Sequence, residues 1–139
     1  MVKNILSDTF LQKELVRSFP SYFSSFENLE EELRKPFIKI LVYVIDNKIL
    51  GFLNYSLIYD RIELNFIEVL NDYRDQHIGS YLLEEMFKES VVNYTLEVRS
   101  DNFSAIHLYE KYGFVKKAVR TKYYHGVDGY LMEKEGVLR

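Results

Sequence analysis

One segment of the chain places an arginine just before a predicted helix, in the run IEVLNDYRDQHIGSYLL at residues 67–83. Arg74 precedes the helix, and Gly79 lies in its first turn. Free N–H groups at a helix N-terminus attract phosphate, and glycine allows a ligand to approach closely. The backbone of residues 76–80 is therefore a candidate diphosphate site. The alternative is an ordinary helix start capped by Asp75, because an arginine followed by a glycine at this spacing is common.

A second segment, TLEVRSDNFSAIHLYEKYGF at residues 95–114, contains two groups that could transfer protons. Leu96 and Val98 are apolar positions of a predicted strand, so Glu97 should point to the opposite face. The Glu97 carboxylate could act as a general base, and the alternative is a solvated surface residue. Tyr109 lies on the packed face of the next predicted helix. Its hydroxyl could protonate a leaving group, and the alternative is a core tyrosine with a satisfied hydroxyl.

The first segment resembles the coenzyme A motif of the GNAT acetyltransferase superfamily, written Q/R-x-x-G-x-G/A. Arg74 and Gly79 match its two ends, and His77 stands at its first glycine, where we expect helical backbone that tolerates a side chain. The resemblance implies an α/β acyl-CoA N-acyltransferase fold, with a mostly antiparallel sheet and a splayed, bulged central strand. It also implies acetyl-CoA as cosubstrate. The residues that it assigns to the coenzyme are Ile67, Val69, Arg74, Gln76, His77, Ile78, Gly79, Ser80, Asn102 and Tyr109.

The second segment and the C-terminal run are similar to the bacterial ribosomal-protein-alanine N-acetyltransferases, a branch of the same superfamily. The similarity lies in the Leu-Glu-Val-Arg run at 96–99, in the Leu-Tyr pair that includes Tyr109, and in the R-x-x-Y-Y sequence at 120–124. It implies that Glu97 is the general base and Tyr109 the general acid. It further implies that the acceptor is the N-terminal α-amino group of a ribosomal protein. Glu68 is the reserve candidate for the base, because it too lies between apolar residues of a strand.

The reaction implied is direct attack of an amine on an acetyl thioester in a ternary complex, without a covalent intermediate. The chain has no cysteine, which excludes a cysteine acyl-enzyme and a disulfide framework. An α-amino group with a pKa of about 8 loses its proton more readily than a lysine near 10.4. A backbone N–H near Val69, freed by a bulge, would hold the oxyanion. Two other functions stay open: acetylation of a small amine or another protein, and a non-catalytic coenzyme-binding module.

The hydrophobic period predicts the elements that must position these residues. In chain order they are a helix from Ser7 or Asp8 to Phe19, a helix at 26–35, strands at 38–45, 49–58 and 61–70, a helix at 76–89 capped by Asp75, a strand at 92–98, a helix from Asn102 to Gly113 and two final strands. This order describes one mixed α/β sheet with helices on both faces. In the strand at 61–70 the apolar positions change parity. A β-bulge near Phe66 and Ile67 is one explanation, and a strand buried on both faces is the other.

The composition is that of an ordinary globular protein. The chain has 139 residues, 47% of them apolar, and a net charge of −3, which indicate one domain over residues 1–139. A slightly acidic chain lacks the basic surface needed for extensive nucleic-acid binding. The longest apolar run, at 40–45, is far short of the roughly 20 residues that span a bilayer, and the N-terminus does not resemble a secretory signal. We therefore expect a cytoplasmic protein without membrane contact. Three histidines without an HExxH sequence predict no metal site.

Overall fold

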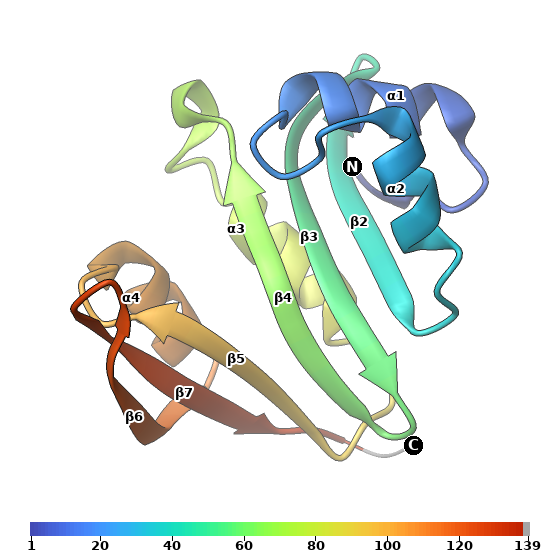
Figure 1. Ribbon diagram of the computed structural model, residues 1–139. Helices are drawn as coiled ribbons and strands as arrows, with labels where there is room; N and C mark the ends of the chain where they lie inside the picture. The colour runs from blue at the N-terminus through green and yellow to red at the C-terminus, as the bar shows by residue number, and fades with distance from the viewer. Residues whose placement is uncertain (138–139) are drawn as a thin grey trace. The chain divides into compact units, whose positions relative to one another are not determined.

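The computed structural model describes residues 1–137, and the chain forms two compact units (Figure 1). The first unit holds Met1–Leu57 and Phe66–Glu89, and the second holds Ile58–Asn65 and the chain from Ser90 onward. Over the described residues, seven strands form a mixed, mostly antiparallel sheet in the order β1 (Val2–Asn4), β2 (Ile38–Ile45), β3 (Lys48–Ile58), β4 (Arg61–Val69), β5 (Asn93–Arg99), β7 (Val127–Glu135) and β6 (Val115–Tyr124). Strand β4 (Arg61–Val69) contributes its first half to the second unit and its second half to the first.

The first unit has helices on both faces of its strands, as predicted. Its elements are β1 (Val2–Asn4), α1 (Thr9–Ser18), α2 (Phe26–Leu33), β2 (Ile38–Ile45), β3 (Lys48–Ile58), the short 3₁₀ helix η1 (Asn71–Tyr73) and α3 (Ile78–Met86). Alternate residues of β2 point to opposite faces. Ile40 and Val42 join the hydrophobic core that α1 and α2 cover, whereas Tyr43 stacks on Tyr81 of α3. Figure 1 shows α1 and α2 on one side of β2 and β3, with α3 on the other.

Helices α1 and α2 begin where the sequence predicts. The Asp8 side chain accepts a hydrogen bond from the N–H of Leu11 at 3.0 Å, as an N-cap does. Of the two predicted cap residues, Ser7 and Asp8, the structure therefore selects Asp8. Helix α2 is capped by Ser25 and is followed by a C-cap at Arg34, so it is slightly shorter than predicted.

The predicted hairpin of β2 and β3 is confirmed, and it contains an irregularity that the sequence did not indicate. The two turn residues, Asp46 and Asn47, both have left-handed backbone, which matches the twist of a tight hairpin. The register shifts between Tyr43 and Val44, and Leu50 is the extra residue of β3. This bulge belongs to β3.

Strand β4 shows the change of alternation that the sequence indicated. Ile62 and Leu64 are buried, whereas Phe66, at the next position of the same parity, is exposed. The register of β4 with the parallel strand β5 (Asn93–Arg99) runs over the four positions from Arg61 to Leu64. The bulge near Phe66 and Ile67 stays a prediction.

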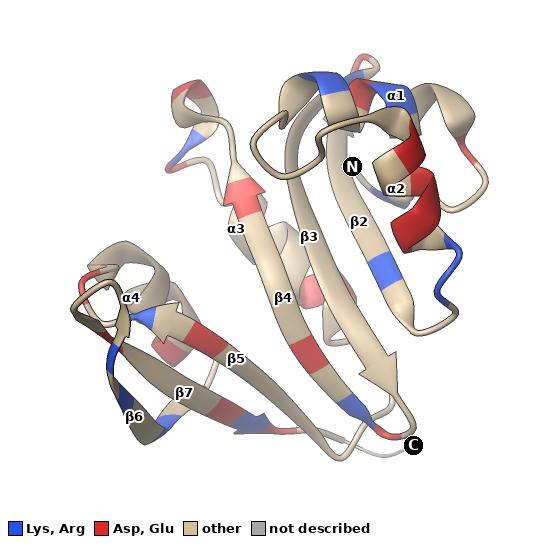
Figure 2. Cartoon of the chain, in the orientation of Figure 1, with Lys and Arg blue, Asp and Glu red and all other residues tan. Residues whose placement is uncertain are grey.

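The second unit pairs β5 with β7 (Val127–Glu135), and β7 with β6 (Val115–Tyr124), all antiparallel. Helix α4 (Phe103–Lys111) connects β5 to β6. It begins after an Asn102 cap, and Gly113 follows it with left-handed backbone at φ 94°, as predicted. In Figure 2, β6 carries stretches coloured for Lys and Arg, and α2 of the first unit carries stretches coloured for Asp and Glu.

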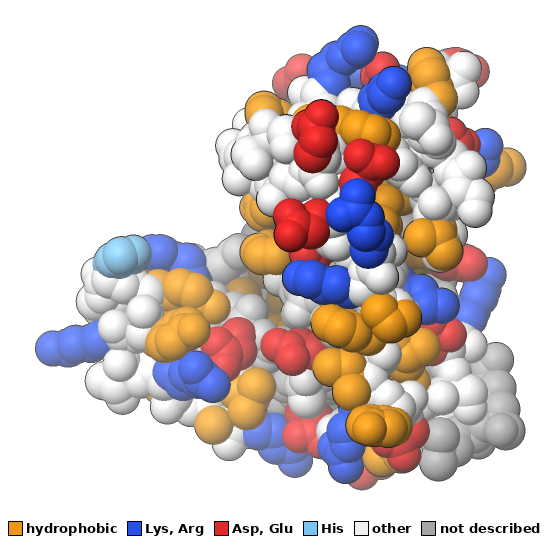
Figure 3. Space-filling model, turned by 45° about the vertical axis from the view of Figure 1, so that its right-hand side comes forward, with side chains coloured by type: hydrophobic (Ala, Val, Ile, Leu, Met, Phe, Trp, Pro, Cys, Tyr) orange, Lys and Arg blue, Asp and Glu red, His pale blue; other side chains and the backbone are white. Residues whose placement is uncertain are grey.

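The surface carries charges of both signs. Figure 3 shows acidic and basic side chains interspersed on the face that it presents, in keeping with the small net charge of the chain. Within residues 1–137, every helix is too short or too polar to cross a membrane.

Candidate active site

Helix α3 begins two residues later than predicted, and the residues before it have unusual backbone. Its cap is His77, which is left-handed at φ 63° and makes no side-chain cap hydrogen bond. Asp75 is left-handed as well, at φ 64°. The prediction that Asp75 caps the helix is therefore wrong, and so is the prediction of helical backbone at His77. Glycine, the residue of the GNAT motif at this place, adopts a left-handed conformation without steric cost, whereas His77 carries a Cβ.

The N-terminus of α3 offers backbone rather than side chains to a ligand. Ile78 and Ser80 are buried in the first unit, Gly79 is half-buried and Gln76 is exposed. The first N–H groups of an α-helix have no acceptor within the helix and carry partial positive charge. These amides, with Arg74 in the preceding loop, therefore form a positively polarised site of the kind that binds phosphate groups.

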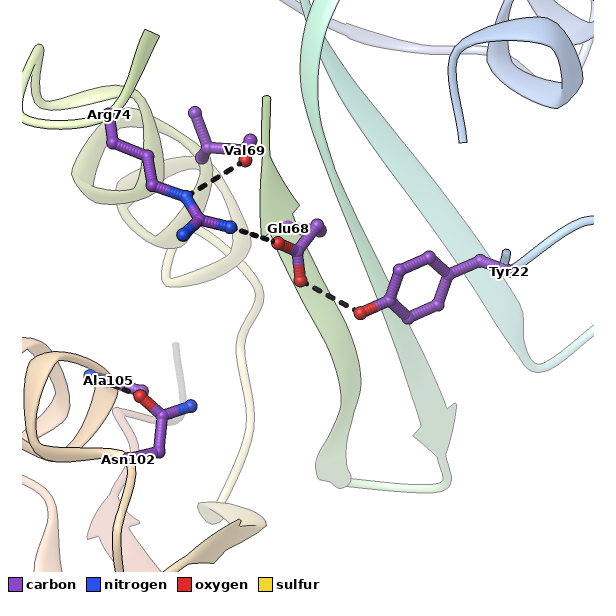
Figure 4. A network of polar contacts seen from close by, with 6 residues as sticks. All are labelled: Tyr22, Glu68, Val69, Arg74, Asn102 and Ala105. Carbon is purple, nitrogen blue, oxygen red and sulfur yellow. Dashed lines mark hydrogen bonds and ion pairs between the residues drawn. The ribbon is translucent and has the colours of Figure 1, made fainter. Parts of the chain in front are cut away.

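Arg74 belongs to a network around Glu68 at the end of β4 (Figure 4). Its Nη2 donates a hydrogen bond to Glu68 Oε1 at 2.7 Å, and its Nε donates to the carbonyl of Val69 at 3.3 Å. Ile67 and Val69, the two predicted coenzyme contacts on β4, are both half-buried. The structure thus brings Arg74 together with Glu68, the reserve candidate for the base.

Tyr22, in the loop between α1 and α2, completes this network. Its hydroxyl donates a hydrogen bond to Glu68 Oε2 at 2.8 Å. Burial and the hydrogen bond to Glu68 raise the pKa of Tyr22 to about 12, so the hydroxyl keeps its proton at neutral pH. Sequence reasoning missed Tyr22, because it lies 46 positions from Glu68 and its local pattern does not mark it.

Glu97 lies on β5 with its side chain opposite the buried Leu96 and Val98, as predicted. Its Oε1 is 2.9 Å from Nε of Arg120 on β6, and the Glu97 side chain is 24% exposed. The guanidinium of Arg120 also lies over the ring of Tyr123, 5.0 Å from its centroid. Glu97 is therefore a partly exposed, ion-paired carboxylate of the second unit. The Arg120 partner was missed, because strand order cannot be predicted from residue type.

The tyrosine pair of the R-x-x-Y-Y sequence lies beside this carboxylate. Burial raises the pKa of Tyr124, and the negative charge of Glu97 raises it further, while Arg120 and Arg99 act in the opposite direction. The rings of Tyr123 and Tyr124 meet edge to face with centroids 4.9 Å apart. Arg99 lies over the Tyr124 ring at 5.8 Å.

Tyr109 is a packed residue of α4. It is 6% exposed, and its ring meets Phe114 edge to face with centroids 5.8 Å apart. Asn102 caps the same helix, since its Oδ1 accepts a hydrogen bond from the N–H of Ala105 at 3.2 Å (Figure 4). The cap and the aromatic contact give Tyr109 a fixed position within the second unit. Among residues 1–137, no three His, Asp or Glu side chains gather as a metal ion would require.

The chain matches the Acetyltransferase (GNAT) family over residues 1–114. It is 33% identical to an N-alpha-acetyltransferase of Saccharolobus solfataricus over 143 aligned positions, which cover 86% of this chain and 80% of that protein. It is 38% identical to the [ribosomal protein bS18]-alanine N-acetyltransferase of Escherichia coli K12 over 88 positions, which cover 60% of each chain.

A solved structure shows the same fold over nearly the whole chain. It is the ribosomal-protein-S18-alanine N-acetyltransferase from Escherichia coli, with a TM-score of 0.82 at 24% identity, over 100% of this chain and 95% of that one. The family match covers well over half of the chain, and it includes the loop before α3 as well as Glu97 and Tyr109. The chain therefore belongs to the GNAT family and is an acetyl-CoA-dependent N-acetyltransferase.

Proposed function

We propose that the protein acetylates an N-terminal α-amino group, with a ribosomal protein as its acceptor. The observation that carries this proposal is the pair of curated relatives, one named an N-alpha-acetyltransferase and the other a ribosomal protein bS18-alanine N-acetyltransferase. The R-x-x-Y-Y sequence beside Glu97 supports it. An α-amino group, with a pKa of about 8, also needs only a modest base at neutral pH.

In this proposal, the loop and amides before α3 hold the diphosphate of acetyl-CoA, which supplies the acetyl thioester. Arg74 and the N–H groups of residues 78–80 provide positive charge, and Gly79 leaves room for the ligand. Asn102 belongs to the coenzyme contacts that the family resemblance assigns. A backbone N–H near Val69 holds the oxyanion of the tetrahedral intermediate.

Glu97 and Tyr109 carry the two proton transfers. Glu97 accepts the proton of the attacking amine, directly or through water, and the N–C bond to the acetyl carbon forms. Tyr109 donates its proton to the departing thiolate as the C–S bond breaks. The products are the acetylated amine and free coenzyme A. The chain has no cysteine, so the acetyl group does not pass through a cysteine thioester on the enzyme.

The test is acetyl transfer in vitro, followed by mass spectrometry of the acceptor. The protein is incubated with acetyl-CoA and a peptide that copies the N-terminus of bS18, a matched peptide with a blocked N-terminus and an internal lysine, or spermidine. We expect one acetyl group on the N-terminal residue of the free peptide and none on the blocked peptide. Acetylation of spermidine or lysine alone would replace the proposal with a small-amine or lysine acetyltransferase. Coenzyme binding without any acetylated acceptor would indicate a non-catalytic module.

A further inference from the structure

The proposed function places the Arg74 guanidinium at the diphosphate of acetyl-CoA. In the structure this guanidinium already has hydrogen-bond partners within the first unit. Arg74 donates to Glu68 at 2.7 Å and to the carbonyl of Val69 at 3.3 Å. The second oxygen of Glu68 accepts the hydroxyl of Tyr22 at 2.8 Å. The loop that should receive a strongly negative ligand therefore has a carboxylate bound to its cation.

We propose that Glu68 competes with the coenzyme diphosphate for Arg74, so that Arg74 exchanges the carboxylate for phosphate when acetyl-CoA binds. Glu68 thereby acts as a positioning residue that sets coenzyme affinity through Arg74. This inference rests on the proposed function, because it assumes that the diphosphate lies at the N-terminus of α3.

The exposure of the Arg74–Glu68 pair means that breaking it costs little free energy. The Arg74 side chain is 56% exposed and that of Glu68 28%, and an exposed ion pair of this kind contributes little to stability. A diphosphate offers more negative charge and more acceptor oxygens than one carboxylate, and guanidinium binds phosphate through two parallel hydrogen bonds.

Tyr22 keeps the carboxylate satisfied after the exchange. Its ring contacts Phe52 and Phe66 edge to face, with centroids 5.3 Å and 5.5 Å apart. These contacts hold the hydroxyl at Glu68 whether or not Arg74 is present. The released carboxylate therefore retains one donor from the protein and can be hydrated at its other oxygen, since its side chain is partly exposed.

The test is a double-mutant cycle on the affinity for coenzyme A, measured by calorimetry at constant ionic strength. The four proteins are the wild type, Glu68→Gln, Arg74→Gln and the double variant. We expect Glu68→Gln to tighten binding by about two- to fivefold, the range that loss of an exposed competing ion pair allows. We expect the same substitution to leave affinity unchanged in the Arg74→Gln background, where there is no guanidinium to release.

Two further variants control for general effects. Asp72→Asn removes one negative charge from η1 of the same segment, and we expect a smaller effect than that of Glu68→Gln. Tyr22→Phe keeps the ring contacts and the Glu68–Arg74 pair, and we expect no tightening of coenzyme binding.

Equal tightening by Glu68→Gln in the wild-type and Arg74→Gln backgrounds would show direct repulsion between Glu68 and the diphosphate and would overturn the exchange. Weaker binding by Glu68→Gln would overturn it as well, because Glu68 would then orient Arg74 for the ligand. A folded wild type that binds no coenzyme A would instead refute the proposed function.

Discussion

Glu97 and Tyr109 are held in the second unit by different kinds of contact. Glu97 pairs with Arg120 at 2.9 Å and is partly exposed, whereas Tyr109 is buried against Phe114. A substitution at Glu97 therefore removes a charge, and Tyr109→Phe removes one oxygen from a packed ring. Conservative substitutions at these two positions can separate chemistry from folding.

We predict that Tyr109→Phe lowers turnover by about ten- to ten-thousand-fold, because the departing thiolate loses its proton donor. The ring contact with Phe114 is retained, so the thermal unfolding midpoint should change little. Release of free thiol from acetyl-CoA measures turnover. Tyr112→Phe, at the end of the same helix, is the matched control and should leave turnover unchanged. Wild-type turnover in Tyr109→Phe would remove this residue from the mechanism.

The two candidate bases predict different pH profiles. If Glu97 accepts the proton, Glu97→Gln should lower kcat/KM for the acceptor most near pH 6, where the α-amino group is protonated, so its rise with increasing pH becomes steeper. Glu68→Gln should keep the wild-type profile at saturating acetyl-CoA if Glu68 acts through Arg74. The measurement is kcat/KM from about pH 6 to 9, the range around the α-amino pKa. A steeper profile in Glu68→Gln alone would move the assignment of the base to Glu68.

At the scale of single residues, the sequence predicted to which face of a strand a side chain points. It did not predict which other residues that side chain contacts. The alternation of Leu96, Glu97 and Val98 follows from strand geometry alone, and the structure confirms it. The contacts of Arg120 with Glu97 and of Tyr22 with Glu68 join segments far apart in the chain. Such contacts depend on strand order and loop path, which single-sequence patterns do not contain.

At the scale of elements, helix starts were predicted well wherever a side chain caps the helix. Asp8, Ser25 and Asn102 each accept a hydrogen bond from the third residue of the following turn. Helix α3 lacks such a cap, and its start was misplaced because Asp75 has the right residue type but left-handed backbone. The three residues that cap a helix all have negative φ, whereas Asp75 does not.

We predict that His77→Gly stabilises the protein by roughly 0.5 to 1 kcal/mol. A residue with a Cβ is strained at φ 63°, at a cost of about 1–2 kcal/mol, and relief of this strain exceeds the extra entropy of glycine in the unfolded chain. Urea denaturation measures the free energy of unfolding. His107→Gly is the matched control, because His107 is exposed within α4, and we expect it to destabilise by roughly 0.3 to 0.5 kcal/mol. Destabilisation by both substitutions would argue against strain at His77.

At the scale of the whole molecule, the predicted order of α-helices and β-strands is confirmed from α1 to β7, whereas the 3₁₀ helix η1 was not predicted. The first strand, β1, was missed, because Val2–Asn4 is too short to show a period. The division into two compact units was also not predicted, since composition is uniform along the chain and β4 belongs to both. Hydrophobic pattern indicates which segments form strands, whereas the grouping of strands into units depends on contacts between segments distant in sequence.

Coenzyme binding should stabilise the folded chain by mass action, which gives a test that needs no acceptor. At 100 times its Kd, a ligand that binds only the folded state adds about 2.7 kcal/mol, which raises Tm by roughly 5 to 15 °C in a chain of this size. We predict such a rise with coenzyme A for the wild type, measured by differential scanning fluorimetry. Gly79→Val places a branched side chain in the first turn of α3, so it should reduce the rise at the same coenzyme concentration while changing the Tm of the free protein much less. An equal rise in both proteins would mean that the diphosphate lies elsewhere than at the N-terminus of α3.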